Sequence, residues 1–315
     1  QKEGVVFVGP RPEQMNMFGL KHEARALAEQ AKVPLLPGSE LLKDVEEAKV
    51  TAVKIGYPVI LKSTAGGGGI GMQICQSEKD LNDAFDSVKR LSANNFSNDG
   101  VFIEKYIEYA RHIEVQVFGD GRGGIVTLGE RDCSAQRRHQ KVIEETPAPN
   151  LPAAVREELH SVAERLMASV EYQNAGTVEF ILDQSSNAFY FLEVNTRLQV
   201  EHGVTECVYS ADLVEWMLTL AADPTLDLST LQYNAQPQGH AVQVRVYAED
   251  ANKNFQPSAG LLSYVKFPNV DAGQGRIDTW IESGSEVPSF FDPMVAKVIS
   301  HSGSREEAIA KLQTG

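Results

Sequence analysis

A run of glycines between two short apolar segments constrains this chain more than any other feature. Residues 65–71 read Ala-Gly-Gly-Gly-Gly-Ile-Gly, and the apolar segments 59–61 and 72–75 on either side predict two strands. Consecutive glycines cost much backbone entropy, but they let backbone N–H groups approach a phosphate closely. We therefore predict a hairpin that covers a polyphosphate, with Lys62 at its base supplying a positive charge. The alternative is a flexible surface hairpin without a ligand.

The glycine run contains the spacing Gly-x-Gly-x-x-Gly, but its surroundings exclude two common nucleotide motifs. A dinucleotide fingerprint needs a helix directly after the glycines, whereas residues 72–75 predict a strand. A P-loop needs Gly-Lys-Ser/Thr at its end, whereas Lys62 precedes the glycines.

Length, charge and cysteine count exclude several classes of protein. The 315 residues suffice for about two domains. A net charge of −14 opposes binding to nucleic acid or to anionic lipid, and no apolar run approaches the length of a membrane span. The three cysteines lie far apart without metal-type spacing, which argues against a zinc site or a disulfide scaffold. We expect a soluble protein of a reducing compartment, the cytoplasm.

The two ends of the sequence suggest a piece of a larger polypeptide. The chain starts at Gln1, without a methionine or a signal peptide, and enters the strand-like segment 5–8. It stops at Gly315, soon after the capping box of Ser304 and Glu307 opens a helix.

Hydrophobic periodicity predicts an α+β chain in three parts. An apolar stripe through Met17 and Leu20 predicts the first helix. The predicted helices are 13–32, 44–55, 77–91, 152–170 and 210–221. The predicted strands beyond the hairpin are 101–106, 112–118, 125–128, 177–182, 189–194, 240–247, 262–267 and 294–300. The three parts are a connecting segment with a helix (1–33), a small α+β unit (34–106) and a larger unit (107–315).

Two acidic residues are predicted to face each other on neighbouring strands. If the hairpin formed by 177–182 and 189–194 is symmetric about Ser186, Glu179 lies opposite Glu193. Directly opposed like charges destabilise a sheet unless a cation lies between them, and Mg²⁺ binds carboxylates together with phosphates. The pair therefore predicts a divalent metal site; the alternative is two acids that point into solvent.

Two polar runs could bind an anion. Residues 130–141 are too polar for a core strand, and a solvated face is the favoured interpretation, but their basic residues could form a local anion site. Residues 195–202 combine Arg197, Gln199 and Glu201, which could hold a small oxyanion and remove its proton; an ordinary polar loop is the alternative. His202 is more simply structural. A phosphate-covering loop, a metal site and an oxyanion site together indicate ATP-dependent phosphoryl transfer to an oxyanion.

The chain also resembles a known family over almost its whole length. The strings 62–72, 104–106, 111–114, 130–145, 176–180, 191–206 and 291–294, together with Lys297, are similar to the biotin carboxylase module of biotin-dependent carboxylases, an ATP-grasp enzyme. The resemblance implies a lid subdomain (34–106) packed on a larger antiparallel-sheet subdomain, with the family's N-terminal Rossmann-like subdomain absent from this fragment.

The resemblance also implies a role for individual residues. ATP would bind Lys21, Lys62, Gly66, Gly67, Gly68, Gly69, Glu104, Lys105, Ile107, His112, His139 and Ile181. Mg²⁺ or Mn²⁺ would bind Glu179, Glu193 and Asn195, and bicarbonate would bind Lys141, Arg197, Gln199 and Val200. Glu201 would deprotonate bicarbonate to give carboxyphosphate, and Arg245 would stabilise the biotin enolate, so that the catalytic group is Glu201, Arg197, Lys141 and Arg245.

Residues 62–72 look most like the urea carboxylase (urea amidolyase) branch, with acyl-CoA and pyruvate carboxylases as alternatives. Two departures from the common family pattern are Ile70, in place of an arginine, and Gly203, in place of a proline. Biotin is expected to arrive on a carrier domain of the parent polypeptide, which would also contain a carboxyltransferase. We expect the piece alone to have weak activity or none, or to act as an incomplete nucleotide-binding fragment. Another ATP-grasp ligase with a different acceptor is a third possibility.

Overall fold

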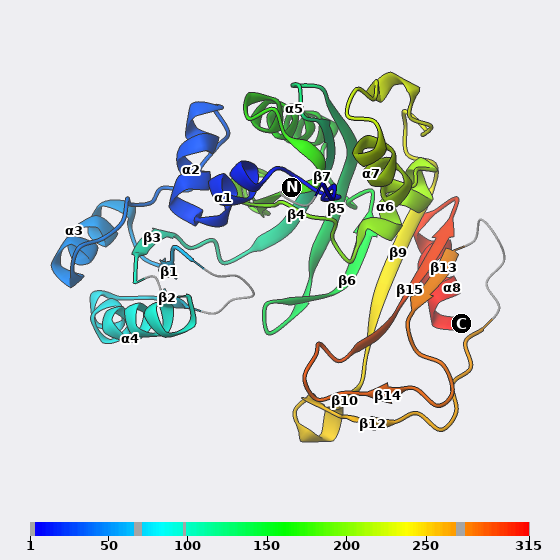
Figure 1. Ribbon diagram of the computed structural model, residues 1–315. Coiled ribbons are helices and arrows are strands. Elements are labelled where there is room, and N and C mark those ends of the chain that lie inside the picture. The colour runs from blue at the N-terminus through cyan, green and yellow to red at the C-terminus, as the bar shows by residue number, and fades with distance from the viewer. Residues whose placement is uncertain (1–3, 66–70, 97–98, 269–274, 315) are drawn as a thin grey trace.

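Two antiparallel sheets organise the chain, as Figure 1 shows. The computed structural model describes residues 4–65, 71–96, 99–268 and 275–314. Within these ranges the small sheet has the strand order β2-β1-β3 and the large one has the order β13-β15-β9-β6-β5-β4-β7-β8. The small sheet consists of β1 (Val59–Ser63), β2 (Met72–Cys75) and β3 (Val101–Lys105). The large sheet consists of β4 (Ala110–Asp120), β5 (Ile125–Arg137), β6 (Gln140–Thr146), β7 (Gln173–Asp183), β8 (Phe189–Asn195), β9 (His240–Tyr247), β13 (Gly275–Thr279) and β15 (Met294–Ser302).

The small sheet packs on two helices and has its own hydrophobic core. Helix α3 (Val45–Ile55) is capped by Asp44, whose side chain accepts a hydrogen bond from the Glu47 N–H, and it ends at Gly56, where φ is +83°. Helix α4 (Glu78–Phe96) lies beside α3 and packs on β1 and β2. The core buries Leu61, Leu81 and Ile103 among others. The two helices and three strands predicted here are confirmed.

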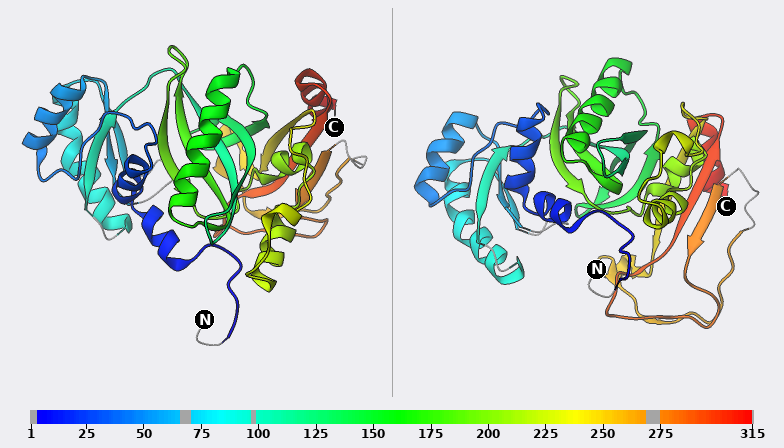
Figure 2. Two further views of the ribbon diagram at one scale, coloured as in Figure 1. Left: turned by 90° about the horizontal axis from the view of Figure 1, so that it is seen from above. Right: turned by 45° about the horizontal axis from the view of Figure 1, so that its top comes forward.

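Helices cover both faces of the large sheet (Figure 2). On one face α5 (Ala153–Ser169) packs against β4 and β5, with Leu159 and Leu166 buried. On the other face α6 (His202–Tyr209) and α7 (Leu213–Ala222) bury Trp216 against Phe118. Helix α8 (Arg305–Thr314) lies against β15 and β9, and the Glu307 N–H donates to Ser304 Oγ as the capping box predicts.

The remaining elements are short. They are the 3₁₀ helices η1 (Leu228–Thr230) and η2 (Ala251–Lys253), and the strand pairs β10 (Glu249–Asp250) with β11 (Gln256–Pro257) and β12 (Gly260–Leu261) with β14 (Glu286–Val287). Within the described ranges, every helix is too short or too polar to cross a lipid bilayer.

Four predictions of local structure are wrong. The expected helix 13–32 is two helices, α1 (Pro12–Gly19) and α2 (Lys21–Gln30), because Leu20 is extended. This break turns Met17 outward, to 40% exposure, and buries Phe18 instead. Segment 5–8 forms no strand, and segment 262–267 lies outside any strand.

The fourth error is the expectation that residues 130–141 are too polar for a core strand, because β5 extends to Arg137 and residues 130–133 are buried. The expected helix 210–221 is confirmed as α7, which begins at Leu213 after the N-cap Asp212. Helix α6 was not predicted, nor were strands β6 and β13. The boundaries 1–33, 34–106 and 107–315 stay a prediction.

Candidate functional site

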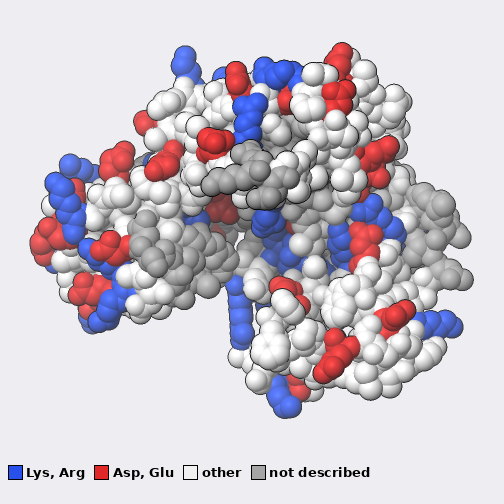
Figure 3. Space-filling model, in the orientation of Figure 1, with Lys and Arg blue, Asp and Glu red and all other residues white. Residues whose placement is uncertain are grey.

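A cavity of about 850 Å³ lies between the small sheet and the large sheet. Figure 3 shows Lys and Arg side chains in the hollow at the centre of the molecule, although the chain is acidic overall. The predicted residues that line the cavity are Lys21, Lys62, Lys105, Ile107, His112, His139, Lys141, Glu179, Ile181, Glu193, Asn195, Arg197, Gln199, Val200, Glu201 and Arg245. Gly66, Gly67, Gly68 and Gly69 lie outside the described residues. The tertiary structure thus gathers segments that are up to 224 positions apart, from Lys21 to Arg245.

The two acids of the β7–β8 hairpin face each other as the sequence predicts. Glu179 and Glu193 are direct partners in the strand register. Glu179 is 3% exposed, and it accepts a hydrogen bond of 2.8 Å from Asn195 Nδ2. Glu193 is less buried, and its Oε2 lies 2.9 Å from Lys21 Nζ. The alternative of two acids in solvent therefore does not hold for Glu179.

Lys141 on β6 forms ion pairs with three carboxylates from three separate segments. Its Nζ atom lies 2.5 Å from Glu114, 2.8 Å from Glu179 and 2.7 Å from Glu201. Burial by itself lowers the pKa of Lys141, but the surrounding acids, Glu114 foremost, outweigh it and raise that pKa above its ordinary value. Lys141, which lines the cavity, therefore stays positively charged.

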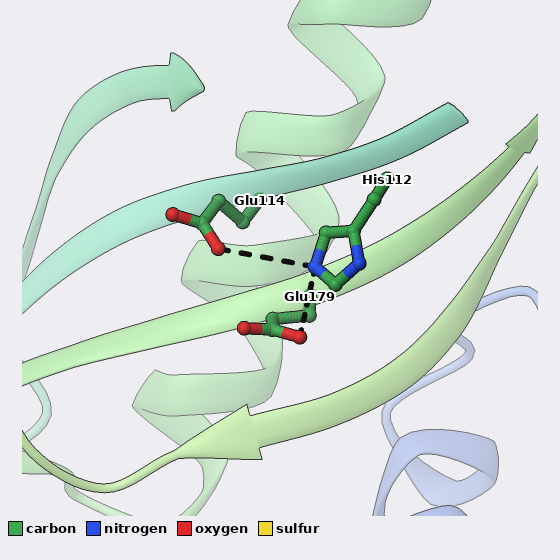
Figure 4. Close-up of side chains that lie close together, drawn as sticks. All are labelled: His112, Glu114 and Glu179. Atoms are coloured by element: carbon green, nitrogen blue, oxygen red, sulfur yellow. Dashed lines mark ion pairs between the residues drawn. The ribbon is translucent and has the colours of Figure 1, made fainter. Parts of the chain in front are cut away.

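His112 lies between two of these carboxylates, as Figure 4 shows. Its Nε2 atom is 2.9 Å from Glu179 and 3.9 Å from Glu114. Burial disfavours the charged imidazole, but Glu179 outweighs burial and raises the pKa of His112. The same contact, together with Lys141, holds the pKa of Glu179 well below its ordinary value despite burial. Glu179 is therefore ionised in the absence of a metal.

Glu114 and Arg131 are site residues that sequence reasoning missed. Both side chains are fully buried, and Arg131 Nε donates to Glu114 Oε1 at 2.5 Å. Arg131 also donates to Gln116 and Thr205. The solvated interpretation of residues 130–141 is thus wrong at Arg131, because its charge is neutralised inside the sheet. The alternation of polar residues at 112, 114 and 116 was the available signal, since it marks one face of β4 as polar.

Glu201 is shared by two cations. Besides Lys141, it contacts Arg245, whose Nη2 lies 3.1 Å away. Arg245 also pairs with the fully buried Glu144 at 2.6 Å, so that two acids surround it. Burial opposes the charge on Arg245, but Glu144 and Glu201 raise its pKa. Arg245 therefore stays cationic beside Glu201.

Two predicted ATP residues are paired with each other. Lys62 forms an ion pair with Glu104, and Glu104 also lies 2.5 Å from Arg25 Nη1 on α2. Lys105, the residue after Glu104, lines the cavity, and the place of Glu104 in the nucleotide pocket stays a prediction. Two further predicted anion ligands, His139 and Arg197, line the cavity and are exposed to solvent. Arg197 Nη2 lies 3.5 Å from Asn195 Oδ1.

The oxygen atoms of the hairpin fit a hard divalent cation. Glu179 and Glu193 supply carboxylates and Asn195 an amide oxygen, the ligand types that Mg²⁺ takes together with phosphate. The group of His112, Glu114 and Glu179 is also close enough for a metal. There, however, Glu114 is fully buried and held by two cations, Arg131 and Lys141, whereas Glu193 is partly exposed and lines the cavity. The hairpin residues are therefore the better donor set.

Comparisons with known proteins agree with this geometry. Residues 21–229 match the family described as carbamoyl-phosphate synthase L chain, ATP binding domain, and residues 243–315 match the biotin carboxylase C-terminal domain. Urea amidolyase from Saccharomyces cerevisiae is 52% identical over 311 residues, which cover 98% of this chain and 16% of that protein. Biotin carboxylase 2 from Bacillus subtilis is 49% identical over 315 residues, which cover 100% of this chain and 70% of that protein.

A solved structure is similar over the same extent. The biotin carboxylase domain of 2-oxoglutarate carboxylase from Hydrogenobacter thermophilus, in complex with MgADP, ADP and bicarbonate, is 38% identical, with a TM-score of 0.93. The match covers 99% of this chain and 68% of that one. The chain spans about a sixth of the length of the urea amidolyases that it matches. The resemblance and the fold class predicted from the sequence are confirmed: the chain belongs to the biotin carboxylase family of ATP-grasp proteins.

Proposed function

We propose that this chain carboxylates biotin with ATP and bicarbonate, as the biotin carboxylase part of a urea carboxylase. One observation carries the proposal: Glu201 lies between Lys141 and Arg245 in the same cavity as the Glu179–Glu193 pair. The two cations can bind an anion, and the carboxylate base between them can remove its proton. The neighbouring hairpin can hold the metal and thus the phosphate that this anion attacks. The urea branch is supported by the 52% identity to a urea amidolyase.

Bicarbonate is proposed to bind at the cationic end of the cavity. Lys141 and Arg197 supply charge, and Gln199 and Val200 supply polar groups of the loop before α6. Glu201 accepts the bicarbonate proton, so that an oxygen atom of the resulting dianion attacks the γ-phosphorus of ATP. The bond from that phosphorus to the bridging oxygen breaks, which yields ADP and carboxyphosphate.

ATP is proposed to lie along the wall nearer the small sheet. Lys21 and Lys62 contact its phosphates, and Lys105, Ile107, His112, His139 and Ile181 border the rest of the nucleotide. The glycines 66–69 are proposed to cover the phosphates. Mg²⁺ held by Glu179, Glu193 and Asn195 supplies neutralisation of phosphate charge. Lys21 and Lys62 exchange their present carboxylate partners for phosphate oxygens when the nucleotide enters.

The carboxyl acceptor is proposed to reach Arg245 from outside this chain. Arg245 is cationic and lines the cavity next to Glu201, so it can stabilise negative charge that develops on the acceptor. Biotin on a carrier domain is the proposed acceptor, with a carboxyltransferase of the same polypeptide as the next enzyme. We also infer a cytoplasmic location, because Cys75, Cys133 and Cys207 are all free thiols.

The test is ATP hydrolysis by the intact protein that carries this chain, measured with and without bicarbonate and free biotin. We expect hydrolysis that depends on bicarbonate and increases with biotin. Glu201→Gln should lower it by about a hundredfold or more, because the general base is lost. Glu157→Gln, at an exposed position on α5, is the matched control.

Three outcomes would contradict the proposal. Hydrolysis that persists in bicarbonate-free buffer indicates a ligase with another acceptor. Nucleotide binding without hydrolysis indicates a binding module. Product analysis with urea, acyl-CoA and pyruvate decides the branch, and carboxylation of an acyl-CoA or of pyruvate would exclude urea carboxylase.

A further inference from the structure

A buried lysine outside the cavity contacts the loop that carries the proposed bicarbonate ligands. This loop, residues 196–201, connects β8 to α6 and is called the 196–201 loop below. Lys297 on β15 is 8% exposed, and its Nζ atom donates to the Val200 carbonyl oxygen at 2.7 Å. Val200 lines the cavity, whereas Lys297 does not. Lys297 therefore acts on the cavity through the backbone of Val200.

The strand register explains why Lys297 points at this carbonyl. Lys297 is the direct partner of Arg245 on β9 and of Asp278 on β13, so the three side chains share one face of the sheet. Arg245 is drawn to Glu144 and Glu201. Lys297 Nζ lies 3.1 Å from Asp278 Oδ2. The side chains of Arg245 and Lys297 therefore contact different acids, and Asp278 holds Lys297 beside Val200.

The preceding carbonyl of the loop is held as well. His202 Nδ1 lies 2.7 Å from the Gln199 carbonyl oxygen. Since a carbonyl only accepts, Nδ1 carries the hydrogen, and burial lowers the pKa of His202 to about 4, which leaves the ring neutral at neutral pH. Nε2 is then an acceptor, and Arg276 Nη2 lies 3.3 Å from it. Arg276 is in turn fixed by Glu206, at 2.7 Å.

Two consecutive peptide groups of the 196–201 loop are therefore anchored from the side away from the cavity. The side chains that flank them, Gln199 and Glu201, are 4% and 2% exposed and point to Lys141. The bond from Lys297 is charge-assisted, and such bonds are stronger than those between neutral groups. Its loss lets the Val200–Glu201 peptide rotate, which moves a proposed bicarbonate ligand and the proposed base together.

We propose that Lys297 is a positioning residue for bicarbonate, which holds the Val200 carbonyl and thereby the geometry of Gln199 and Glu201. This inference rests on the function proposed above. It requires no contact between Lys297 and substrate. The expected effect is specific for bicarbonate, because Lys21 and Lys62, the proposed phosphate ligands, lie on α2 and β1, whereas Lys297 lies on β15.

The test compares Lys297→Met, Lys297→Arg and the control Lys253→Met in the intact protein. Lys253 forms an exposed surface pair with Asp250. For Lys297→Met we expect kcat/KM for bicarbonate to fall about tenfold or more, the scale of one charge-assisted hydrogen bond, while ADP affinity changes less than about twofold. Lys297→Arg keeps a cationic donor and should recover most of the loss. Lys253→Met should behave as wild type.

Several results would overturn the inference. One is a bicarbonate kcat/KM that Lys297→Met leaves unchanged; another is an equal loss of ADP and bicarbonate binding, which indicates general loosening of the fold. A third is failure of Lys297→Arg to recover any activity. If Lys297→Met does not fold, Asp278→Asn takes its place, with an expected loss of about threefold for bicarbonate alone. Wild-type protein that ignores bicarbonate overturns the proposed function and this inference with it, whereas a bicarbonate-dependent wild type with unaffected variants overturns only the inference.

Discussion

Glu179 and Glu193 lie opposite each other on β7 and β8, yet each carboxylate is held by a different lysine. Lys141 on β6 holds Glu179, and Lys21 on α2 holds Glu193. Two acids that would repel each other are thus separated by cations from distant segments. We propose that a divalent cation entering the hairpin would replace the lysines as the neutralising charge.

Removal of one hairpin carboxylate should selectively weaken the binding of Mg²⁺. For Glu193→Gln we expect the Mg²⁺ concentration at half-maximal ATP hydrolysis to rise about tenfold or more, since one of two anionic ligands is lost. The measurement is a Mg²⁺ titration at saturating ATP and bicarbonate. Glu164→Gln, on the exposed side of α5, should show no change. An unaltered Mg²⁺ dependence in Glu193→Gln would remove Glu193 from the metal site.

Lys141 should contribute to stability as well as to activity. Lys141→Met leaves Glu114, Glu179 and Glu201 without their common cation, and we expect the free energy of unfolding to fall by about 3–5 kcal/mol. Added Mg²⁺ should recover part of this loss, because a cation that binds only the folded state stabilises it. Urea unfolding with and without Mg²⁺ measures both effects. Equal stability of variant and wild type in metal-free buffer would contradict the prediction.

The fully buried pair of Arg131 and Glu114 allows a double-variant test. Arg131→Met should lower the free energy of unfolding by about 3–5 kcal/mol, since it leaves a buried carboxylate with less compensation. The double variant Arg131→Met/Glu114→Gln should be more stable than Arg131→Met alone, because the unpaired charge is gone. Urea denaturation of wild type, of Arg131→Met, of Glu114→Gln and of the double variant gives the coupling. Additive effects would show that the two side chains act independently.

Glu130 predicts a specific pH dependence of stability. Burial opposes its ionisation, but hydrogen bonds from His160 and Arg156 outweigh burial and lower the pKa of Glu130 from 4.5. A folded pKa below the unfolded one stabilises the protein above about pH 4.5, and the contribution disappears as the pH falls through the folded pKa. We therefore expect the stability difference between wild type and Glu130→Gln to shrink as the pH is lowered from 6 to 3. A constant difference over that range in urea titrations would contradict this cause.

Local patterns were sufficient where near neighbours decide the structure. The facing of Glu179 and Glu193 followed from a short turn and a period of two, and the end of α3 at Gly56 followed from local sequence. Leu20 shows the limit of such patterns: its extended conformation turns one expected helix into two and shifts which side chains are buried. An apolar stripe of correct spacing does not reveal such a break.

The burial and pairing of the charged residues around the cavity could not be predicted in the same way. Arg131 sits in a polar run whose composition favours solvent, and its burial depends on Glu114 and Thr205, which are 17 and 74 positions away. Lys297 depends on Val200, 97 positions away. No local rule states that such partners will meet.

The amino-acid sequence by itself determined most strands of the two sheets, the pairing of Glu179 with Glu193, the resemblance to the biotin carboxylase family and half of the residues that line the cavity. Local backbone preferences and side-chain periodicity act over a few positions, and the sequence displays them directly. Only the tertiary structure decided which charges are buried and paired, because the cost of burying a charge is offset solely by partners that folding brings into contact. Lys141 among its three carboxylates is the clearest case.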